Sequence, residues 1–357
     1  MNDLFSLLKS AVEKNASDIF IVTGFPISFK ISGLIKPQEE ERMNPEATDS
    51  MIREIYSIAN RDITILFQNG DDDFSLSVQG LCRFRVSTYK QRGSLSAVIR
   101  MVSFGIPDYR KLGIPEYVME ISNISKGLVL FTGPAGSGKS TTLACLIDRI
   151  NNTREGHIIT LEEPIEYLHR DKKSIISQRE IGQDSESFIT ALRASLRQAP
   201  NVILVGEMRD HITIQTAMTA AETGHLIIST LHTVGAANTI DRIIDVFPPN
   251  QQQQIRNQLS MILQKVVSQQ LIPTVDGSLI PAFEVLTVNN AVRTMIRESK
   301  SHQIDSFINS SGSEGMVSMD SSIMNLFHRK IISRETALKF ALNTELMSRK
   351  FEIQADE

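Results

Sequence analysis

The stretch that decides the fold reads Gly133-Pro134-Ala135-Gly136-Ser137-Gly138-Lys139-Ser140. The apolar segment 128–131 precedes it and a helical pattern over 141–150 follows it, which is the context that a phosphate-binding loop requires. The glycines let backbone N–H groups turn towards a β-phosphate, and the helix N-terminus adds a partial positive charge. A structural tight turn is the alternative, but it would not require all eight positions. The stretch therefore predicts a phosphate-binding loop, or P-loop.

Two side chains at the end of this loop carry its chemistry. Lys139 is expected to reach the β- and γ-phosphates, and Ser140 to offer a hydroxyl to Mg²⁺. Thr141 and Thr142 either contact the nucleotide or cap the helix. ATP and Mg²⁺ are therefore the predicted cofactors. The predicted nucleotide-binding residues are Gly133, Pro134, Ala135, Gly136, Ser137, Gly138, Lys139, Ser140 and Thr141.

Two kinds of pattern divide the chain. Short alternating segments within 17–100 are typical of antiparallel strands, and helical spacing over 1–12 and 45–67 adds helices, so a small α+β domain is predicted there. From residue 127, apolar runs alternate with helical patterns, which indicates an α/β domain with a mostly parallel sheet. The predicted strands are 128–131, 157–161, 202–205 and 226–229, and the predicted helices are 141–150, 187–198, 213–223 and 250–271, with a mostly helical remainder.

Paired glycine and proline residues near 105–107 and 113–115 mark the boundary between these parts. We predict four parts along the chain: an N-terminal domain, a linker, an ATPase domain with a helical C-terminal part, and a tail, spanning 1–103, 104–115, 116–345 and 346–357. The net charge is −4 and the basic residues are scattered, so nucleic acid is not an expected partner. No apolar run approaches 18 residues, and no membrane span is expected.

Carboxylates follow two of the predicted strands. Glu207 follows 202–205 and is the candidate on the magnesium side, while Glu162 follows 157–161 and is the candidate base that takes a proton from water. Glu207 could instead cap the next helix, and the acids of 162–166 could be solvated loop residues. His232 follows the strand 226–229 and the two residues, Thr230 and Leu231, that continue it. It could sense a γ-phosphate or have a structural role.

With these residues in hand, the chain resembles the secretion and pilus ATPase superfamily, and more narrowly the type IV pilus retraction ATPases of the PilT and PilU kind. Residues 133–140 match the family's Walker A motif, 161–166 its acidic box, 203–210 its Walker B motif and 224–232 its histidine box. The resemblance implies a RecA-like P-loop ATPase domain beside a smaller PAS-like α+β domain. It implies Glu162 as base, Glu207 with Ser140 on the metal, and His232 near the γ-phosphate.

The resemblance also implies that Arg85 and Arg100 approach the nucleotide when the two domains close; surface salt bridging is their alternative role. As partners it implies further copies in a homohexamer, an inner-membrane pilus platform protein and a paralogous retraction ATPase. As location it implies the cytoplasm, peripherally at the inner membrane of the pilus base. The helix 291–298 resembles one that relatives need for retraction rather than hydrolysis.

Two departures and three alternative functions stay open. The family usually has Asp at Glu163 and at Asn201, and Ala199 with segment 314–320 is closer to the PilU branch. An accessory ring subunit with weak or dispensable hydrolysis is therefore the first alternative. A pilus-assembly or secretion ATPase is the second, although relatives of that branch usually carry an extra N-terminal domain and a four-cysteine zinc module, and this sequence has two cysteines. A DNA-strand motor would need a basic groove.

Overall fold

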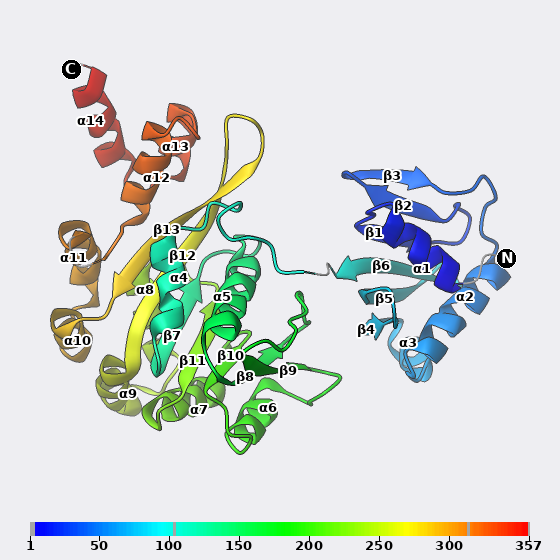
Figure 1. Cartoon of the computed structure of the whole chain (residues 1–357), viewed down its shortest axis with the longest axis horizontal. Helices are drawn as coiled ribbons and strands as arrows, with labels where there is room; N and C mark the ends of the chain where they lie inside the picture. The colour runs from blue at the N-terminus through cyan, green and yellow to red at the C-terminus, as the bar shows by residue number, and fades with distance from the viewer. Residues whose placement is uncertain (1–3, 103–104, 313–314, 356–357) are drawn as a thin grey trace. The chain divides into compact units, whose positions relative to one another are not determined.

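The computed structural model describes residues 4–102, 105–312 and 315–355 (Figure 1). The described residues form two compact units: Met1–Gly105 with Glu166–Leu168, and Ile106–Ile165 with His169–Glu357. Some predictions fall outside the described residues: positions 1–3 of the first helix, the 103/104 boundary, Glu314 of segment 314–320, and 356–357 of the tail. The proposed domain boundaries themselves stay a prediction.

The first unit is an antiparallel sheet with helices packed on one face. Its strands pair in the order β3-β2-β1-β6-β5-β4. Local sequence sets the helix starts: Asn44 accepts a hydrogen bond from the Ala47 backbone N–H (2.8 Å), and Pro45 follows at the first helical position. The elements are α1 (Leu4–Glu13), β1 (Asp18–Ile21), β2 (Ser28–Ile31), β3 (Leu34–Pro37), α2 (Pro45–Ile58), α3 (Thr64–Asn69), β4 (Asp71–Ser77), β5 (Arg83–Gln91) and β6 (Ser94–Val102).

The second unit is built on a mostly parallel sheet, with strand order β13-β12-β7-β11-β10-β8-β9. Pairs among β12, β7, β11, β10, β8 and β9 are parallel, and β13 is antiparallel to β12. The elements up to β11 are α4 (Glu116–Met119), η1 (Glu120–Asn123), β7 (Gly127–Thr132), α5 (Lys139–Thr153), β8 (Gly156–Glu162), β9 (Ser174–Glu180), α6 (Phe188–Ser195), β10 (Val202–Val205), α7 (His211–Glu222) and β11 (Leu226–Leu231).

The C-terminal part adds a strand pair and several short helices. The long hairpin of β12 and β13 runs along the sheet and extends beyond it (Figure 1). The elements are α8 (Ala236–Asp245), α9 (Pro249–Ile262), β12 (Leu263–Pro273), β13 (Leu279–Thr287), α10 (Asn290–Arg297), η2 (Ser301–Gln303), α11 (Ile304–Ser310), α12 (Met319–His328), α13 (Arg334–Phe340) and α14 (Thr344–Ala355).

Helices cover both faces of the large sheet, so its strands are apolar on both sides. On β7, Leu128 and Leu130 pack with residues of α6 to α9, whereas Val129 and Phe131 pack with residues of α4, η1 and α5. Successive strand residues point to opposite faces, and both faces are buried here. The predicted fold class, a mostly parallel α/β unit with a smaller α+β unit, is confirmed.

The predicted helix over 250–271 is wrong in its second half. Helix α9 ends at Ile262, and β12 begins at Leu263. Val266 and Val267 face the two opposite cores of the sheet, so this strand has no alternation of polar and apolar residues. The apolar positions 259, 262, 263, 266 and 267 continue at helical spacing from α9 into β12, which explains the error. The remainder is mostly helical, as predicted, apart from the end of β12 and strand β13. Strand β9 is a further strand that the sequence does not predict.

Candidate functional site

The P-loop joins β7 to α5, as the sequence predicts. Gly138 lies directly before α5 with φ of 86°, in the left-handed region. A Cβ atom there would lie 2.9 Å from Gln269 Nε2, and one on Gly133 would lie 2.9 Å from Ser137 Oγ. Both positions therefore need glycine, for conformation and for space. The loop is a tight backbone cradle whose shape suits a phosphate group.

Lys139 lies over this loop. Its Nζ donates hydrogen bonds to the backbone oxygens of Gly133 (2.7 Å) and Pro134 (2.9 Å), and the residue is buried. Ser140 is exposed at the start of α5. Thr142 donates to Gln269 Oε1 (2.9 Å) on β12, so its role is to pack α5 against the sheet. The Lys139 ammonium group is thus held at the loop.

The remaining candidates lie along the same edge of the sheet. Val205 is the parallel partner of Leu161 on one side and of Ser229 on the other. Glu162, Glu207 and His232 therefore follow the carboxyl ends of the three neighbouring strands β8, β10 and β11. The P-loop follows β7, which is the next neighbour of β11. In open α/β sheets this edge is where ligands bind.

Glu207 and His232 meet at this edge. His232 Nε2 lies 3.7 Å from Glu207 Oε2, and Glu207 is only 14% exposed while His232 is 58% exposed. Arg209 forms an ion pair with the same carboxylate, and the Glu207 contact raises the pKa of the Arg209 guanidinium. Sequence reasoning assigned Arg209 no role. Its place two residues after Glu207, with opposite charge, is the signal that could have found it.

Glu162 is more ordered than a solvated loop acid would be. Its Oε1 accepts hydrogen bonds from Thr160 Oγ1 (2.6 Å) and Gln178 Nε2 (3.2 Å), and the residue is half-buried. Glu163 and Glu166 are exposed, so the solvated alternative describes them better than it describes Glu162. Gln178 was missed because its strand, β9, was not predicted.

A different acid caps the helix after β10. The carboxylate of Asp210 accepts hydrogen bonds from the Thr213 backbone N–H (2.9 Å) and the Thr213 hydroxyl (2.7 Å). Burial opposes ionisation of Asp210, but these bonds outweigh it and lower its pKa. The capping role that rivalled catalysis for Glu207 thus belongs to Asp210.

The two candidate arginines lie in the first unit as neighbours. Arg85 on β5 and Arg100 on β6 are directly paired across the strands, and both are exposed. Arg100 Nε donates to Asp18 Oδ1 (2.8 Å), so the salt-bridge alternative is realised for this residue. Two adjacent guanidinium groups form a surface that suits an anion.

Asn201, one of the two departures from the family pattern, has a clear structural contact. Its Oδ1 accepts a hydrogen bond from the His157 backbone N–H (2.8 Å), at the start of β8. An aspartate oxygen could accept the same bond. The departure therefore leaves this link between β8 and β10 intact.

A metal ion at this edge would need ligands from the nucleotide as well. No group of three or more His, Cys, Asp or Glu side chains that could hold a metal occurs within 4–102, 105–312 and 315–355. Magnesium in nucleotide sites is commonly bound by one or two protein groups together with phosphates and water. Ser140 and Glu207 fit that arrangement, so the residues present suit Mg²⁺ with ATP.

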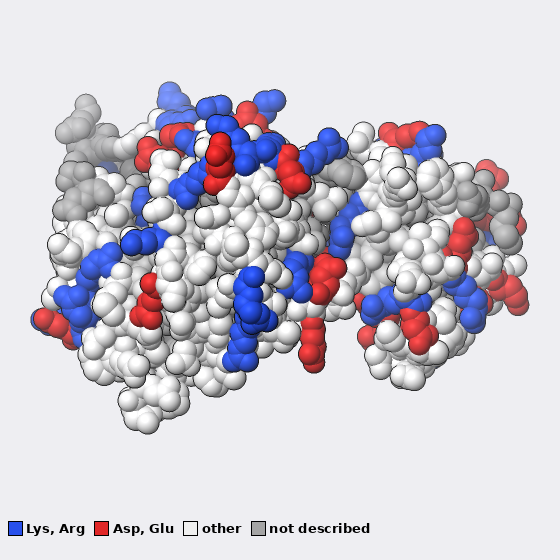
Figure 2. Space-filling model, turned by 60° about the horizontal axis from the view of Figure 1, so that its bottom comes forward, with Lys and Arg blue, Asp and Glu red and all other residues white. Residues whose placement is uncertain are grey.

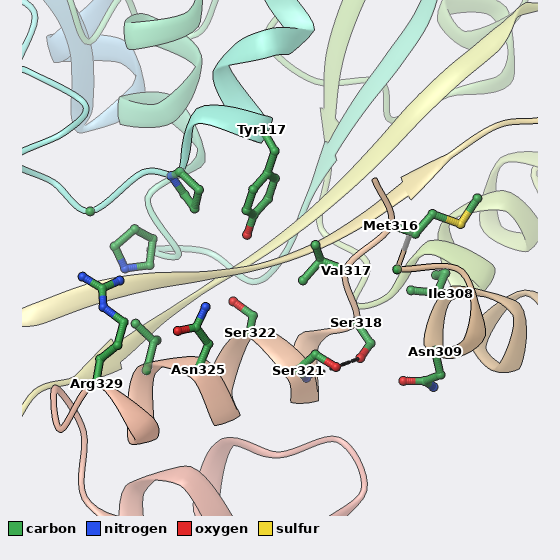
Figure 3. Close-up of a pocket in the computed structure, with 15 residues that line it drawn as sticks. Tyr117, Ile308, Asn309, Met316, Val317, Ser318, Ser321, Ser322, Asn325 and Arg329 are labelled. Atoms are coloured by element: carbon green, nitrogen blue, oxygen red, sulfur yellow. Dashed lines mark hydrogen bonds between the residues drawn. The ribbon is translucent and has the colours of Figure 1, made fainter. Parts of the chain in front are cut away.

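A cavity of about 360 Å³ lies elsewhere, where α12 faces Tyr117 (Figure 3). Its described lining contains no P-loop residue. Ser318 donates to Ser321 Oγ (2.9 Å) and caps α12, so these polar groups have structural partners. The cavity therefore adds nothing to the phosphate site.

Charges on the surface are mixed. On the face in Figure 2, Lys and Arg side chains form several separate groups with Asp and Glu among them. The expectation that nucleic acid is not a partner stays a prediction. Among the described residues, no helix has the length and apolar character needed to cross a membrane.

The large sheet is mostly parallel, a glycine cradle joins β7 to α5, and carboxylates lie at the neighbouring strand ends. These features define a P-loop nucleoside-triphosphate-binding protein. The profile of the family described as Type II/IV secretion system protein matches residues 2–332. The chain belongs to this family.

Individual relatives and solved structures show which members of this family the chain is similar to. The chain is 41% identical to the type IV pilus "retractation ATPase PilT" of Pseudomonas aeruginosa, over 94% of this chain and 97% of that protein. It is 38% identical to the type IV pilus ATPase PilU of the same organism, over 94% and 87%. The crystal structure of the pilus retraction motor PilT with bound ADP has a TM-score of 0.90 at 43% identity, and covers 98% of this chain and 100% of that one.

The predicted family is thereby confirmed. The two identities do not favour the PilU branch, so the closer likeness to PilU stays a prediction.

Proposed function

We propose that this chain is an ATP-hydrolysing motor subunit that drives retraction of a type IV pilus, and thus twitching motility. The carrying observation is the cradle with Lys139 and Ser140 at the same sheet edge as Glu162 and Glu207, in a chain 41% identical to PilT. The accessory-subunit alternative rests on the departures at Glu163 and Asn201 and on the PilU likeness. The identities of 41% to PilT and 38% to PilU do not favour it.

The P-loop residues bind and orient the phosphates. Backbone N–H groups from 133–138 and the N-terminus of α5 face the β-phosphate, and the Lys139 ammonium exchanges its loop oxygens for phosphate oxygens. Ser140 and Glu207 would hold Mg²⁺, which when bound supplies positive charge to the transferring group. Neutralising this charge in a preorganised site lowers the barrier to transfer.

Glu162 is proposed to take the proton of the attacking water. A carboxylate at this position can orient water by hydrogen bonding and accept the proton as transfer proceeds. His232, beside Glu207, is proposed to contact the γ-phosphate side of the site. Arg209 would have to leave the Glu207 carboxylate for metal to bind there. The site therefore changes partners when nucleotide enters.

We also propose that Arg85 and Arg100 bring positive charge to the γ-phosphate. Their cross-strand pairing and exposure support an anion-binding role. Arg100 would exchange Asp18 for phosphate. Turnover per folded molecule of arginine variants decides between this role and salt bridging.

The working assembly is proposed to be a cytoplasmic homohexamer at the inner membrane, acting on a pilus platform protein and beside a paralogous retraction ATPase. The likeness to PilT over nearly the whole of both chains supports this. Helix α10, in the segment 290–297, is proposed to serve retraction rather than hydrolysis.

A purified-protein ATPase assay, read beside native mass, tests the function. Wild type is expected to hydrolyse ATP only with Mg²⁺ and to have the mass of six copies. Lys139→Ala is expected to abolish turnover, because phosphate charge is then uncompensated. Turnover by the variant at a substantial fraction of wild type would refute the P-loop assignment.

A further inference from the structure

Two donors hold the same oxygen of Glu162. Thr160 Oγ1 donates to Glu162 Oε1 at 2.6 Å, and Gln178 Nε2 donates to that oxygen at 3.2 Å. Thr160 and Glu162 are two residues apart on β8 and share a face of the sheet. Gln178 is the direct partner of Thr160 on the neighbouring strand β9. Strand pairing therefore places both donors beside one carboxylate.

The amide of Gln178 has its direction fixed from the other side. Its Oε1 accepts a hydrogen bond from the His169 backbone N–H (2.8 Å). A carboxamide has one accepting and one donating end, so this bond turns the NH₂ group towards Glu162. Gln178 thus links the loop at His169 to the end of β8.

Strand β9 supports the acidic segment at a second point. Glu180, two residues after Gln178 and 3% exposed, accepts a hydrogen bond at Oε2 from the Ile165 backbone N–H (2.9 Å). The strand thus contacts the side chain that ends β8 and also the backbone that follows it. Strand β9, the outermost strand of the sheet, therefore helps to hold residues 162–165 in position.

We propose that Gln178, together with Thr160, is a positioning residue that holds the Glu162 carboxylate in the orientation that accepts the proton of the attacking water. This rests on the proposed function, in which Glu162 is the base. A catalytic group is effective only within a narrow range of positions, and side chains that bond to it set that range. Gln178 therefore acts on the chemical step and not on nucleotide binding.

Two substitutions separate the donor from the acceptor of Gln178. In the full-length protein, Gln178→Leu removes both, and kcat is expected to fall about 10–100-fold, the range typical for residues that orient a functional side chain. Gln178→Glu keeps an acceptor for the His169 N–H but sets a carboxylate against Glu162. Its kcat is expected to fall at least as far. KM for MgATP is expected to stay near that of wild type in both. Gln178→Leu leaves the His169 N–H without this acceptor, so its melting temperature is expected to fall, and kcat is therefore measured per folded molecule.

The control lies on the same strand and the other face. Ser177 Oγ pairs with His157 Nε2 at 2.9 Å, away from Glu162, and Ser177→Ala is expected to keep the wild-type kcat. If Gln178→Glu has normal kcat while Gln178→Leu does not, only the contact with His169 matters and the proposal is overturned. Normal kcat in both overturns it as well.

A double variant tests whether Gln178 acts through Glu162. On a Glu162→Gln background, Gln178→Leu is expected to cause no further loss in the slow residual single-turnover hydrolysis, followed for times much longer than the wild-type reaction, because the group it positions is gone. An additional loss of tenfold or more would show an independent role. If Glu162→Gln alone hydrolyses at the wild-type rate, the base assignment in the proposed function fails. If it is inactive but Gln178→Leu is normal, only the positioning role fails.

Discussion

Replacing Glu284 by leucine should destabilise the larger unit by about 1–3 kcal/mol. Glu284 on β13 is 4% exposed, and its Oε1 accepts a hydrogen bond from the Ala236 backbone N–H (2.9 Å) at the start of α8. The Met319 backbone at the start of α12 also favours the charged form of this carboxylate, and so lowers the pKa of Glu284 against the larger effect of burial. Leucine leaves the Ala236 N–H at the start of α8 without an acceptor, at a cost of about 1–3 kcal/mol. Burial, the largest effect, raises the pKa of Glu284.

The assay is equilibrium unfolding in denaturant near pH 7. Glu284→Gln keeps one oxygen that can accept and should cost roughly half as much as leucine. Glu298→Gln is the control, since Glu298 is exposed and pairs only at the surface with Lys300 (2.6 Å); its effect should stay within about 0.5 kcal/mol. A Glu284→Leu protein within about 0.5 kcal/mol of wild type would refute the view that this carboxylate holds the start of α8.

Two further predictions concern pH and the arginines. Burial lowers the pKa of His169 to about 4, below its unfolded value of about 6.5, so stability is full above about pH 6.5 and is lost as pH falls towards 4. Between pH 7 and pH 4.5, the free energy of unfolding of the wild type should therefore fall by up to about 3 kcal/mol more than that of His169→Gln. Equal decreases in unfolding titrations would contradict this. Arg85→Ala and Arg100→Ala should lower hydrolysis per folded molecule more than ATP affinity. Normal specific activity in a destabilised protein would leave them only a salt-bridge role, worth about 0–1 kcal/mol.

The sequence predicted the P-loop and the strands that lead to it because both depend on local signals. Residues 133–140 need no distant contact to be recognised, and β7, β10 and β11 are short apolar runs between helical patterns. The order of the strands then sets Glu162, Glu207 and His232 at one edge. The catalytic roles of these residues stay predictions.

What sequence reasoning missed depends on contacts distant along the chain. Strand β12 is buried on both faces, so polar and apolar residues do not alternate along it. Val266 and Val267 therefore continue the helical spacing of α9 as readily as they fit a strand. Gln178 gains a role only because β9 pairs with β8. Strand β9 has no regular alternation of buried and exposed residues, so its sequence gives no strong strand signal. Arg209 is the exception, because its place two residues after Glu207, with opposite charge, is a local signal.

The central claim is that Glu162 takes the proton during ATP hydrolysis. Its most direct test is one measurement on Glu162→Gln: the fraction of bound ATP converted to ADP in a single turnover with Mg²⁺. The amide keeps the size and hydrogen-bonding capacity of the side chain but cannot accept the proton. The account predicts that ATP binds as in wild type and stays unhydrolysed at times when wild type has converted all of it. Conversion at the wild-type rate would contradict the account.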